Sequence, residues 1–400
     1  MKQEVRRGTG LFSTGFHRSG TGLGPRGLSP TCGNLWKTDP SPYTNRVTPL
    51  ELTLEVNPRA RVDLIDVRAR ALELHGAALE HYSRCLYVSA HTTAGYLPQP
   101  LAARLASRPD GLDSYLELFR ATFPEAAGYA HDKLDQRHEL QPEQRAVEPA
   151  NADSHLAFIA SGLQSCVTYN ARRPGPVYFV DLDGTNNGTP RRRATTIVGY
   201  NGEEQVARGT LDVPVSPHAV DAVNLKDPKL GLYEQIGEFI ARHGVTKGRV
   251  RLELAAPEQY ASLTVNEYET WLMHHDLAEV LQNPLRFAAE RARHAWNDPK
   301  AIPGKARAYA QYDFVNALNK LIEKLGLQSS FVERLMARTL EVGASRFFQT
   351  DRGVDLLVSD GRTPGIGRVV EGTYQTPILV QWRPATDTVR RVNISLTRFQ

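Results

Sequence analysis

The chain has 400 residues, of which 41% are hydrophobic and 23% are charged, a composition typical of a soluble globular protein. A chain of this length is longer than one that usually folds around a single hydrophobic core, which favours two domains. The formal net charge of +4 is too small to indicate a nucleic-acid partner by itself, and no apolar run reaches the ~20 residues of a membrane span.

Residues 1–47 are rich in Gly, Pro, Ser and Thr, with several Arg and Lys and few large apolar residues. Such a segment cannot bury enough apolar surface to fold by itself, and it lacks the apolar stretch of a secretory signal. We therefore expect a flexible basic arm. The scattered Cys32, Cys85 and Cys166 favour a reducing, cytoplasmic location over a disulfide framework.

A strand, a helix and a second strand are predicted at the start of the folded part. Residues 52–56 alternate apolar and polar side chains, the pattern of a half-buried strand. Residues 67–82 are rich in Ala, Leu and Glu and favour a helix. The short apolar run CLYVSA, residues 85–90, predicts the second strand, which ends just before His91.

The same order of elements recurs in the second half of the chain. Residues 211–215 alternate again, and residues 232–240 carry Leu, Ile and Phe at helical spacing. Gly244 is a typical helix stop. The alternating run RVRLELAA, residues 249–256, then predicts another strand.

Two later segments also recur. The sequence at residues 151–166 resembles that at residues 316–330, since both start with Asn-Ala and contain Gly-Leu-Gln-Ser near the end. Residues 175–200 and 372–396 each read strand, turn, adjacent Arg residues and strand. Recurrence in a fixed order predicts a duplicated domain.

We place the two predicted copies at residues 48–202 and 203–400. The first copy carries HTTAG, AHD and NADSH, at residues 91–95, 130–132 and 151–155. The second carries LTVNEY, HHDL and EGTYQ, at residues 263–268, 274–277 and 371–375. This ordered series resembles the YjbQ-like family, also called secondary thiamine-phosphate synthases, in the form of a diverged tandem duplication.

Each copy departs from the family pattern where the other keeps it. In the first copy, residues 95–105 replace the LTxNEN motif and GPVYF, residues 175–179, stands where GTWQ belongs. In the second copy, residues 255–261 replace HTTA, and Lys320 falls where the family has a histidine. The motifs are therefore divided between the copies.

The resemblance implies an α+β fold, with antiparallel sheets packed against helices, and a homo-oligomer. It implies a small-molecule substrate, such as a phosphorylated metabolite of the thiamine-synthesis type, and a divalent metal, with zinc as the first choice. No membrane partner is expected. A nucleic-acid partner is disfavoured because no aromatic residues are interleaved with the Arg run at residues 191–193.

Three histidines of the first copy match histidines of the family. Their spacing alone is more typical of surface or hydrogen-bonded histidines than of a zinc site. The resemblance implies instead that His91, His131 and His155 hold the metal and leave one position open for water or substrate. Thr92 and Asp132 are adjacent polar groups that could orient these rings.

The remaining site residues have acid–base or hydrogen-bonding side chains. Candidate catalytic residues are Glu267, His275, Asp276 and Asp132. Candidate substrate contacts are Thr92, Thr93, Asn151, Arg191, Arg193, Asn266 and Gln375. Two alternatives stay open: the Arg residues could lie on a charged edge strand, and the NE and HHD motifs could be turn and helix-surface remnants.

The divided motifs lead to a sharper hypothesis. One copy would supply His91, His131 and His155, and the other Glu267, His275 and Asp276, to a composite site. The rival is a single site in the first copy, with the second copy kept for packing. We therefore expect a metal-assisted enzyme acting on a small metabolite; the alternative is a non-catalytic binding or assembly protein.

Overall fold

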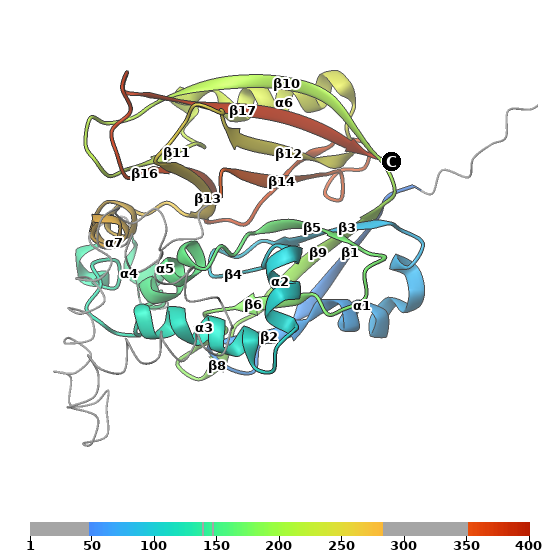
Figure 1. The fold of residues 1–400 in the computed structure, drawn as a ribbon, viewed down its shortest axis with the longest axis horizontal. Coiled ribbons are helices and arrows are strands. Elements are labelled where there is room, and N and C mark those ends of the chain that lie inside the picture. The colour runs from blue at the N-terminus through green and yellow to red at the C-terminus, as the bar shows by residue number, and fades with distance from the viewer. Residues whose placement is uncertain (1–47, 138–139, 146–147, 283–350) are drawn as a thin grey trace, which may run out of the picture. The chain divides into compact units, whose positions relative to one another are not determined.

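A computed structural model describes residues 48–137, 140–145, 148–282 and 351–400 (Figure 1). The predicted basic arm and the repeat at residues 316–330, which contains Lys320, lie outside the described residues. The described residues belong to one compact unit. Within the described ranges, every helix is too short or too polar to cross a membrane.

The first half of this unit, residues 48–202, is mixed α and β. Its elements are β1 (Leu50–Val56), β2 (Asp63–Asp66), α1 (Val67–His75), η1 (Gly76–Leu79), β3 (Arg84–Ser89), β4 (Ala94–Gly95), α2 (Gln99–Ala106), α3 (Gly111–Thr122), η2 (Leu134–Gln136), α4 (Pro142–Arg145), α5 (Ala152–Ala160), β5 (Cys166–Asn170), β6 (Tyr178–Asp181), β7 (Thr185–Asn186), β8 (Thr189–Pro190) and β9 (Arg193–Tyr200). An antiparallel sheet has the strand order β1-β9-β3-β5, and a smaller one has the order β2-β6-β4.

The second half, residues 203–400, is built in the same way. Its described elements are β10 (Glu203–Pro214), β11 (Asp221–Asn224), η3 (Pro228–Leu230), α6 (Leu232–His243), β12 (Lys247–Leu254), β13 (Ala261–Glu267), the π-helical turn η4 (Leu272–Asp276), α7 (Leu277–Gln282), β14 (Gly353–Ser359), β15 (Arg368–Val370), β16 (Gln375–Gln381) and β17 (Val389–Phe399). Its antiparallel sheets have the orders β10-β17-β12-β14-β15 and β11-β16-β13.

The two halves share strand order and local contacts. Strands β10, β17, β12 and β14 take the places of β1, β9, β3 and β5, and β11, β16 and β13 take those of β2, β6 and β4. In the first half, Arg193 Nε donates to Asp181 at 2.7 Å. In the second half, Arg390 Nε donates to Gln381 at 3.3 Å. The same bond therefore joins corresponding strands, with an amide in place of a carboxylate.

The predicted elements are largely confirmed. The alternating and apolar runs form β1, β3, β10 and β12, and α6 ends at Gly244, whose φ of +57° fits a left-handed cap. The helix predicted over residues 67–82 is too long. It ends at His75 because Gly76 has a φ of +59°, and a short 3-10 turn follows.

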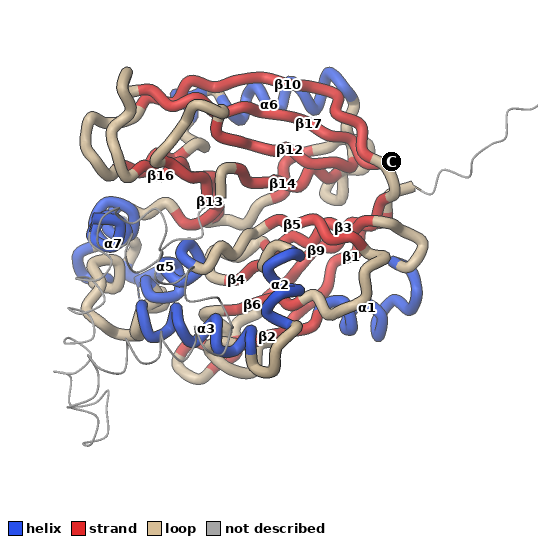
Figure 2. The backbone as a smooth tube through the Cα atoms, in the orientation of Figure 1, coloured by secondary structure: helices blue, strands red, loops and turns tan. Residues whose placement is uncertain are grey.

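The halves pack through the outer faces of their main sheets. Buried side chains from both halves form one apolar cluster: Leu86, Val88, Cys166, Val198, Tyr200, Leu357 and Phe399. The rings of Tyr200 and Phe399 stack with centroids 3.9 Å apart. Figure 2 shows β5 of the first half beside β14 of the second. This apolar contact brings α5 and β13 together.

We predict that Leu357→Ala destabilises the folded chain by about 2–5 kcal/mol, because the fully buried side chain leaves a cavity between the halves. Urea unfolding followed by circular dichroism measures the change. Leu72→Ala is the control, since Leu72 is 53% exposed and should change stability by less than ~0.5 kcal/mol. Equal effects of the two substitutions would contradict this packing.

Candidate functional site

Helix α5 carries polar side chains into the interior. All nine of its residues are buried, including Asp153, Ser154 and His155. A buried polar group needs a hydrogen-bond partner, and α5 packs against β13 of the second half. His155 is only 1% exposed, so the polar side chains of β13 determine which of its ring nitrogens carries the proton.

Asn266 on β13 fixes the tautomer of His155. The Asn266 carbonyl oxygen accepts a hydrogen bond from the backbone N–H of Glu267 at 2.8 Å, and its amide nitrogen donates to the Thr92 carbonyl at 3.0 Å. The same carbonyl oxygen lies 2.7 Å from His155 Nδ1, so Nδ1 must carry the proton. The Nε2 atom of the neutral ring then presents a lone pair.

That lone pair faces a carboxylate. Glu267 Oε2 lies 3.5 Å from His155 Nε2, and Arg137 lies 3.5 Å from the other Glu267 oxygen. Burial raises the pKa of Glu267, whereas burial and the nearby His131 lower the pKa of His155 to about 3. Two acceptor atoms that face each other need a proton or a cation between them. The pair is therefore suited to holding a proton.

His131 is the second buried histidine here. Its Nδ1 donates to Glu269 at 2.9 Å, and its backbone N–H donates to Asp276 at 2.9 Å. Burial disfavours the charged ring, but Glu269 and Glu267 outweigh this effect and raise the pKa of His131. Its Nε2 is buried and has no hydrogen-bond partner among the described residues. One ring nitrogen is thus available for a ligand.

The two rings lie in contact, with centroids 5.4 Å apart. We call the group formed by His131, His155, Asn266, Glu267 and Glu269 the junction site. Its histidines come from the first half and its carboxylates and amide from the second. Of the residues predicted for a composite site, the structure places the rings of His131 and His155 in contact and Glu267 3.5 Å from His155.

His91 lies in a different environment. Its Nε2 accepts a hydrogen bond from the backbone N–H of Ala194 at 3.0 Å, and burial together with Arg193 lowers its pKa to about 4. The nitrogen that a metal would use is therefore occupied. Within the described ranges, no three His, Cys, Asp or Glu residues form a group that could hold a metal ion. Metal binding by His91, His131 and His155 stays a prediction.

The predicted arginines are engaged within the first half. The Arg193 guanidinium donates to both Asp181 oxygens and to the Asp183 carbonyl, and its side chain is 4% exposed. Arg191 pairs with the side chain of Asp183, which also accepts from Asn151 at 2.7 Å. These arginines form internal ion pairs, and β9, which begins at Arg193, is paired on both sides and is not an edge strand. A substrate contact by Arg191 or Arg193 stays a prediction.

Several predicted site residues position the backbone instead. Asp276 accepts from the N–H groups of residues 130 and 131, and Asp132 accepts from the N–H of Ala152 at the start of α5. Gln375 donates to the carbonyl oxygens of Ser89 and His91, at 3.0 Å each. Thr93 lies 3.4 Å from Arg193. These contacts hold the two halves and their loops in place.

His275 does not enter the site. It is exposed, and its ring packs against Trp271 with centroids 4.6 Å apart. Sequence reasoning missed Glu269 and Arg137, which contact His131 and Glu267. The sequence offered little signal for Glu269: it follows two residues after Glu267, but β13 ends at Glu267, so strand alternation does not extend to it.

Comparisons with known proteins find likeness in structure only. No family model and no curated protein match the sequence. A YbjQ-like protein of unknown function from Sulfolobus solfataricus is 15% identical, with a TM-score of 0.26, over 49% of this chain and 99% of the other. A hypothetical protein from Aeropyrum pernix is 18% identical, with a TM-score of 0.24, over 47% and 96%. A yjbq/upf0047-family protein from Clostridium acetobutylicum is 11% identical, with a TM-score of 0.22, over 47% and 98%. With TM-scores this low, these likenesses support no inference about the site.

We predict that His155 is protonated on Nδ1 and neutral between about pH 5 and 8, and that Asn266→Ala removes this preference because the acceptor is lost. Imidazole ¹⁵N chemical shifts measure the tautomer. Asn201→Ala is the control, since Asn201 bonds Ser83 instead. A wild-type His155 protonated on Nε2 would be incompatible with this geometry.

Proposed function

We propose that the protein is an enzyme that transfers protons on a small metabolite at the junction site. One observation carries this proposal. His131 Nε2 is buried without a hydrogen-bond partner among the described residues, next to a His155 lone pair that faces Glu267 at 3.5 Å. Unsatisfied buried polar atoms destabilise a fold, and a catalytic role or a bound ligand is one explanation for keeping such an atom.

The residues of the junction site divide into a proton donor and a proton acceptor. Glu269 holds Nδ1–H of His131, so protonated His131 offers Nε2–H to a substrate atom. Glu267 accepts or holds a proton, with His155 Nε2 as its neighbour. Arg137 lies beside Glu267 and stabilises its charged form. Positioned acid–base groups of this kind accelerate reactions by about 10²–10⁴-fold.

We infer that the two halves arose by tandem duplication within the YjbQ-like family. The shared strand order of both pairs of sheets supports this inference. The corresponding bonds of Arg193 to Asp181 and of Arg390 to Gln381 support it at the level of side chains. The domain limits at residues 48–202 and 203–400 follow from this inference, with the boundary between β9 and β10.

A divalent metal, with zinc as the first choice, stays part of the proposal. His131 and His155 each present an Nε2 atom in the junction site. His91 does not fit as the third ligand in this conformation, because Ala194 occupies its Nε2. No step proposed above depends on a metal.

The substrate class rests on the family resemblance. It points to a small, phosphorylated metabolite, a cytoplasmic location and a homo-oligomer. Arg191 and Arg193 are paired with carboxylates, so a phosphate would need other partners or would have to displace these ion pairs. The phosphate part of the proposal is therefore the part that the geometry supports least.

A non-catalytic assembly protein is the second candidate. The observation that favours it is that three motif residues hold the halves together: Asn266 bonds Thr92, Gln375 bonds His91, and Asp276 bonds residues 130 and 131. An assembly protein would keep these contacts. It would have no use for the unpartnered His131 nitrogen, which is why we prefer the enzyme.

We predict that Glu267→Gln lowers turnover at least about 100-fold while the protein stays folded, because the amide cannot accept the proton. Turnover is measured on a substrate found by incubating the protein with mixtures of phosphorylated metabolites. Glu117→Gln, at an exposed position on α3, is the matched control and should keep full activity. A fully active Glu267→Gln variant would rule out the composite site.

Metal content gives an independent prediction. We expect about one zinc or similar ion per chain by elemental mass spectrometry, and its loss in the His131→Ala/His155→Ala variant. His91→Ala should keep the metal if Ala194 holds His91 as the structure shows. A metal-free protein, even after reconstitution, would remove the metal from the proposal and leave the acid–base site to be judged by turnover.

A further inference from the structure

His131 belongs to the first half, but the second half holds it at two points. Its backbone N–H and that of Ala130 donate to the two carboxylate oxygens of Asp276, at 2.9 Å each. Its ring donates through Nδ1 to Glu269 at 2.9 Å. Glu269 lies just before η4 and Asp276 is the last residue of η4, so one helical turn fixes both the backbone and the ring of His131.

The carboxylate of Glu269 is itself fixed by the start of η4. One of its oxygens accepts from the backbone N–H of Trp271, and the other accepts from that of Leu272, at 2.8 Å each. The oxygen that accepts from Leu272 also accepts from His131. Hydrogen bonds from backbone N–H groups to a carboxylate are among the stronger ones in proteins. The acceptor of the His131 ring therefore cannot move without breaking the first turn of η4.

The other end of η4 has π-helical geometry. The backbone N–H of Leu277 donates to the carbonyl of Leu272, five residues earlier, instead of the four of an α-helix. Asp276 is buried and 1% exposed, whereas His274 and His275 are exposed. This wide turn directs the carboxylate of Asp276 at the first half and leaves the two preceding side chains at the surface. Such turns occur frequently at functional sites.

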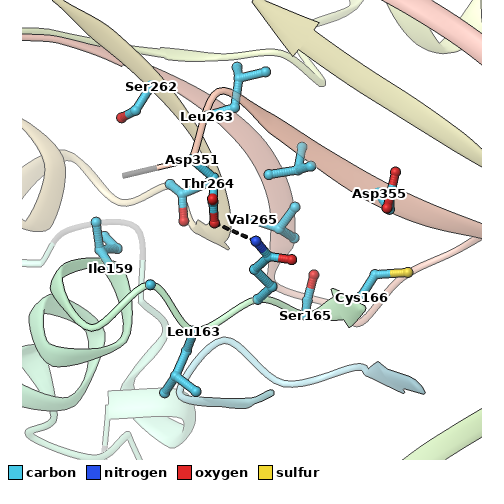
Figure 3. Close-up of a pocket in the computed structure, with 13 residues that line it drawn as sticks. Ile159, Leu163, Ser165, Cys166, Ser262, Leu263, Thr264, Val265, Asp351 and Asp355 are labelled. Carbon is cyan, nitrogen blue, oxygen red and sulfur yellow. Dashed lines mark hydrogen bonds between the residues drawn. The ribbon is translucent and has the colours of Figure 1, made fainter. Parts of the chain in front are cut away.

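The helix that carries His155 is also tied to the second half. Helix α5 contacts both β13 and η4. Beyond its end, the side chain of Gln164 donates to Asp351 of the second half, as Figure 3 shows. Because α5 is held along its length, η4 has a fixed position relative to His155. The second half therefore sets how the ring of His131 meets the ring of His155, with centroids 5.4 Å apart.

We propose that Asp276 is a positioning residue of the junction site, which acts through His131. By fixing the backbone of residues 130 and 131, it brings Nδ1 of His131 to Glu269 and aims Nε2 into the site. This inference rests on the proposed function, in which Nε2 of His131 is the proton donor. An imidazole that is held at its backbone and at Nδ1 has one orientation, and such support from surrounding groups is what a precise acid–base site requires.

The hydrogen bond of the His131 ring tests the proposal without a substrate. In the full chain labelled with ¹⁵N-histidine, NMR measures how fast the Nδ1 protons of His131 and His155 exchange with water. We expect Asp276→Asn to accelerate exchange at His131 at least about tenfold, because an amide can accept only one of the two backbone hydrogen bonds. Exchange at His155 should stay as in the wild type, since its acceptor is Asn266 on β13.

Asp351→Ala is the matched control, because it removes a different hydrogen bond between the halves and should leave the His131 proton unchanged. Equal acceleration in both variants, or an unchanged His131 proton in Asp276→Asn, would overturn the proposal. If Asp276→Asn does not fold, the wild type decides: slow amide exchange at residues 130 and 131 supports the proposal, and rapid exchange there overturns it. Glu267→Gln should keep the His131 hydrogen bond, so failure of this proposal and failure of the catalytic site are separate results.

Discussion

The hydrogen bond between His155 and Asn266 is the contact on which the site depends. Helix α5 has no exposed residue, so its imidazole can find a partner only in the element packed against it. That element is β13 of the other half. By accepting from Nδ1, Asn266 turns Nε2 toward Glu267 and sets the chemistry of the pair. The position of one strand thus determines a protonation state in the other half.

The contacts between the halves give a physical explanation for the division of motifs between them. Glu267 and Asn266 of the second half meet the histidines of the first half at one boundary. Gln375 of the second half likewise supports the loop that contains His91. Under the proposed duplication, each half could lose the groups that the other half supplies across the boundary, because both halves belong to one chain.

Local patterns predicted the elements well, since alternation and helical spacing are properties of a few neighbouring residues. For this reason the end of α6 at Gly244 could be predicted from the sequence. The end of α1 before Gly76 is explained only by the positive φ of Gly76 in the structure. The meeting of His155 with Glu267 was predicted through the divided motifs. The capture of His91 by the backbone of Ala194 was not, because no side-chain pattern records a backbone donor more than a hundred residues away.

Packing and chemistry at this boundary cannot be separated. The apolar cluster around Leu357 and Phe399 holds the sheets together, and the same contact places β13 against α5. Either half alone would expose the apolar cluster and leave His155 without its acceptor, and each unsatisfied buried polar group costs about 1–3 kcal/mol. The halves are therefore not two independent modules. They form one folding unit whose boundary is also the site, so that divergence of either half is constrained by the polar partners that it must present to the other.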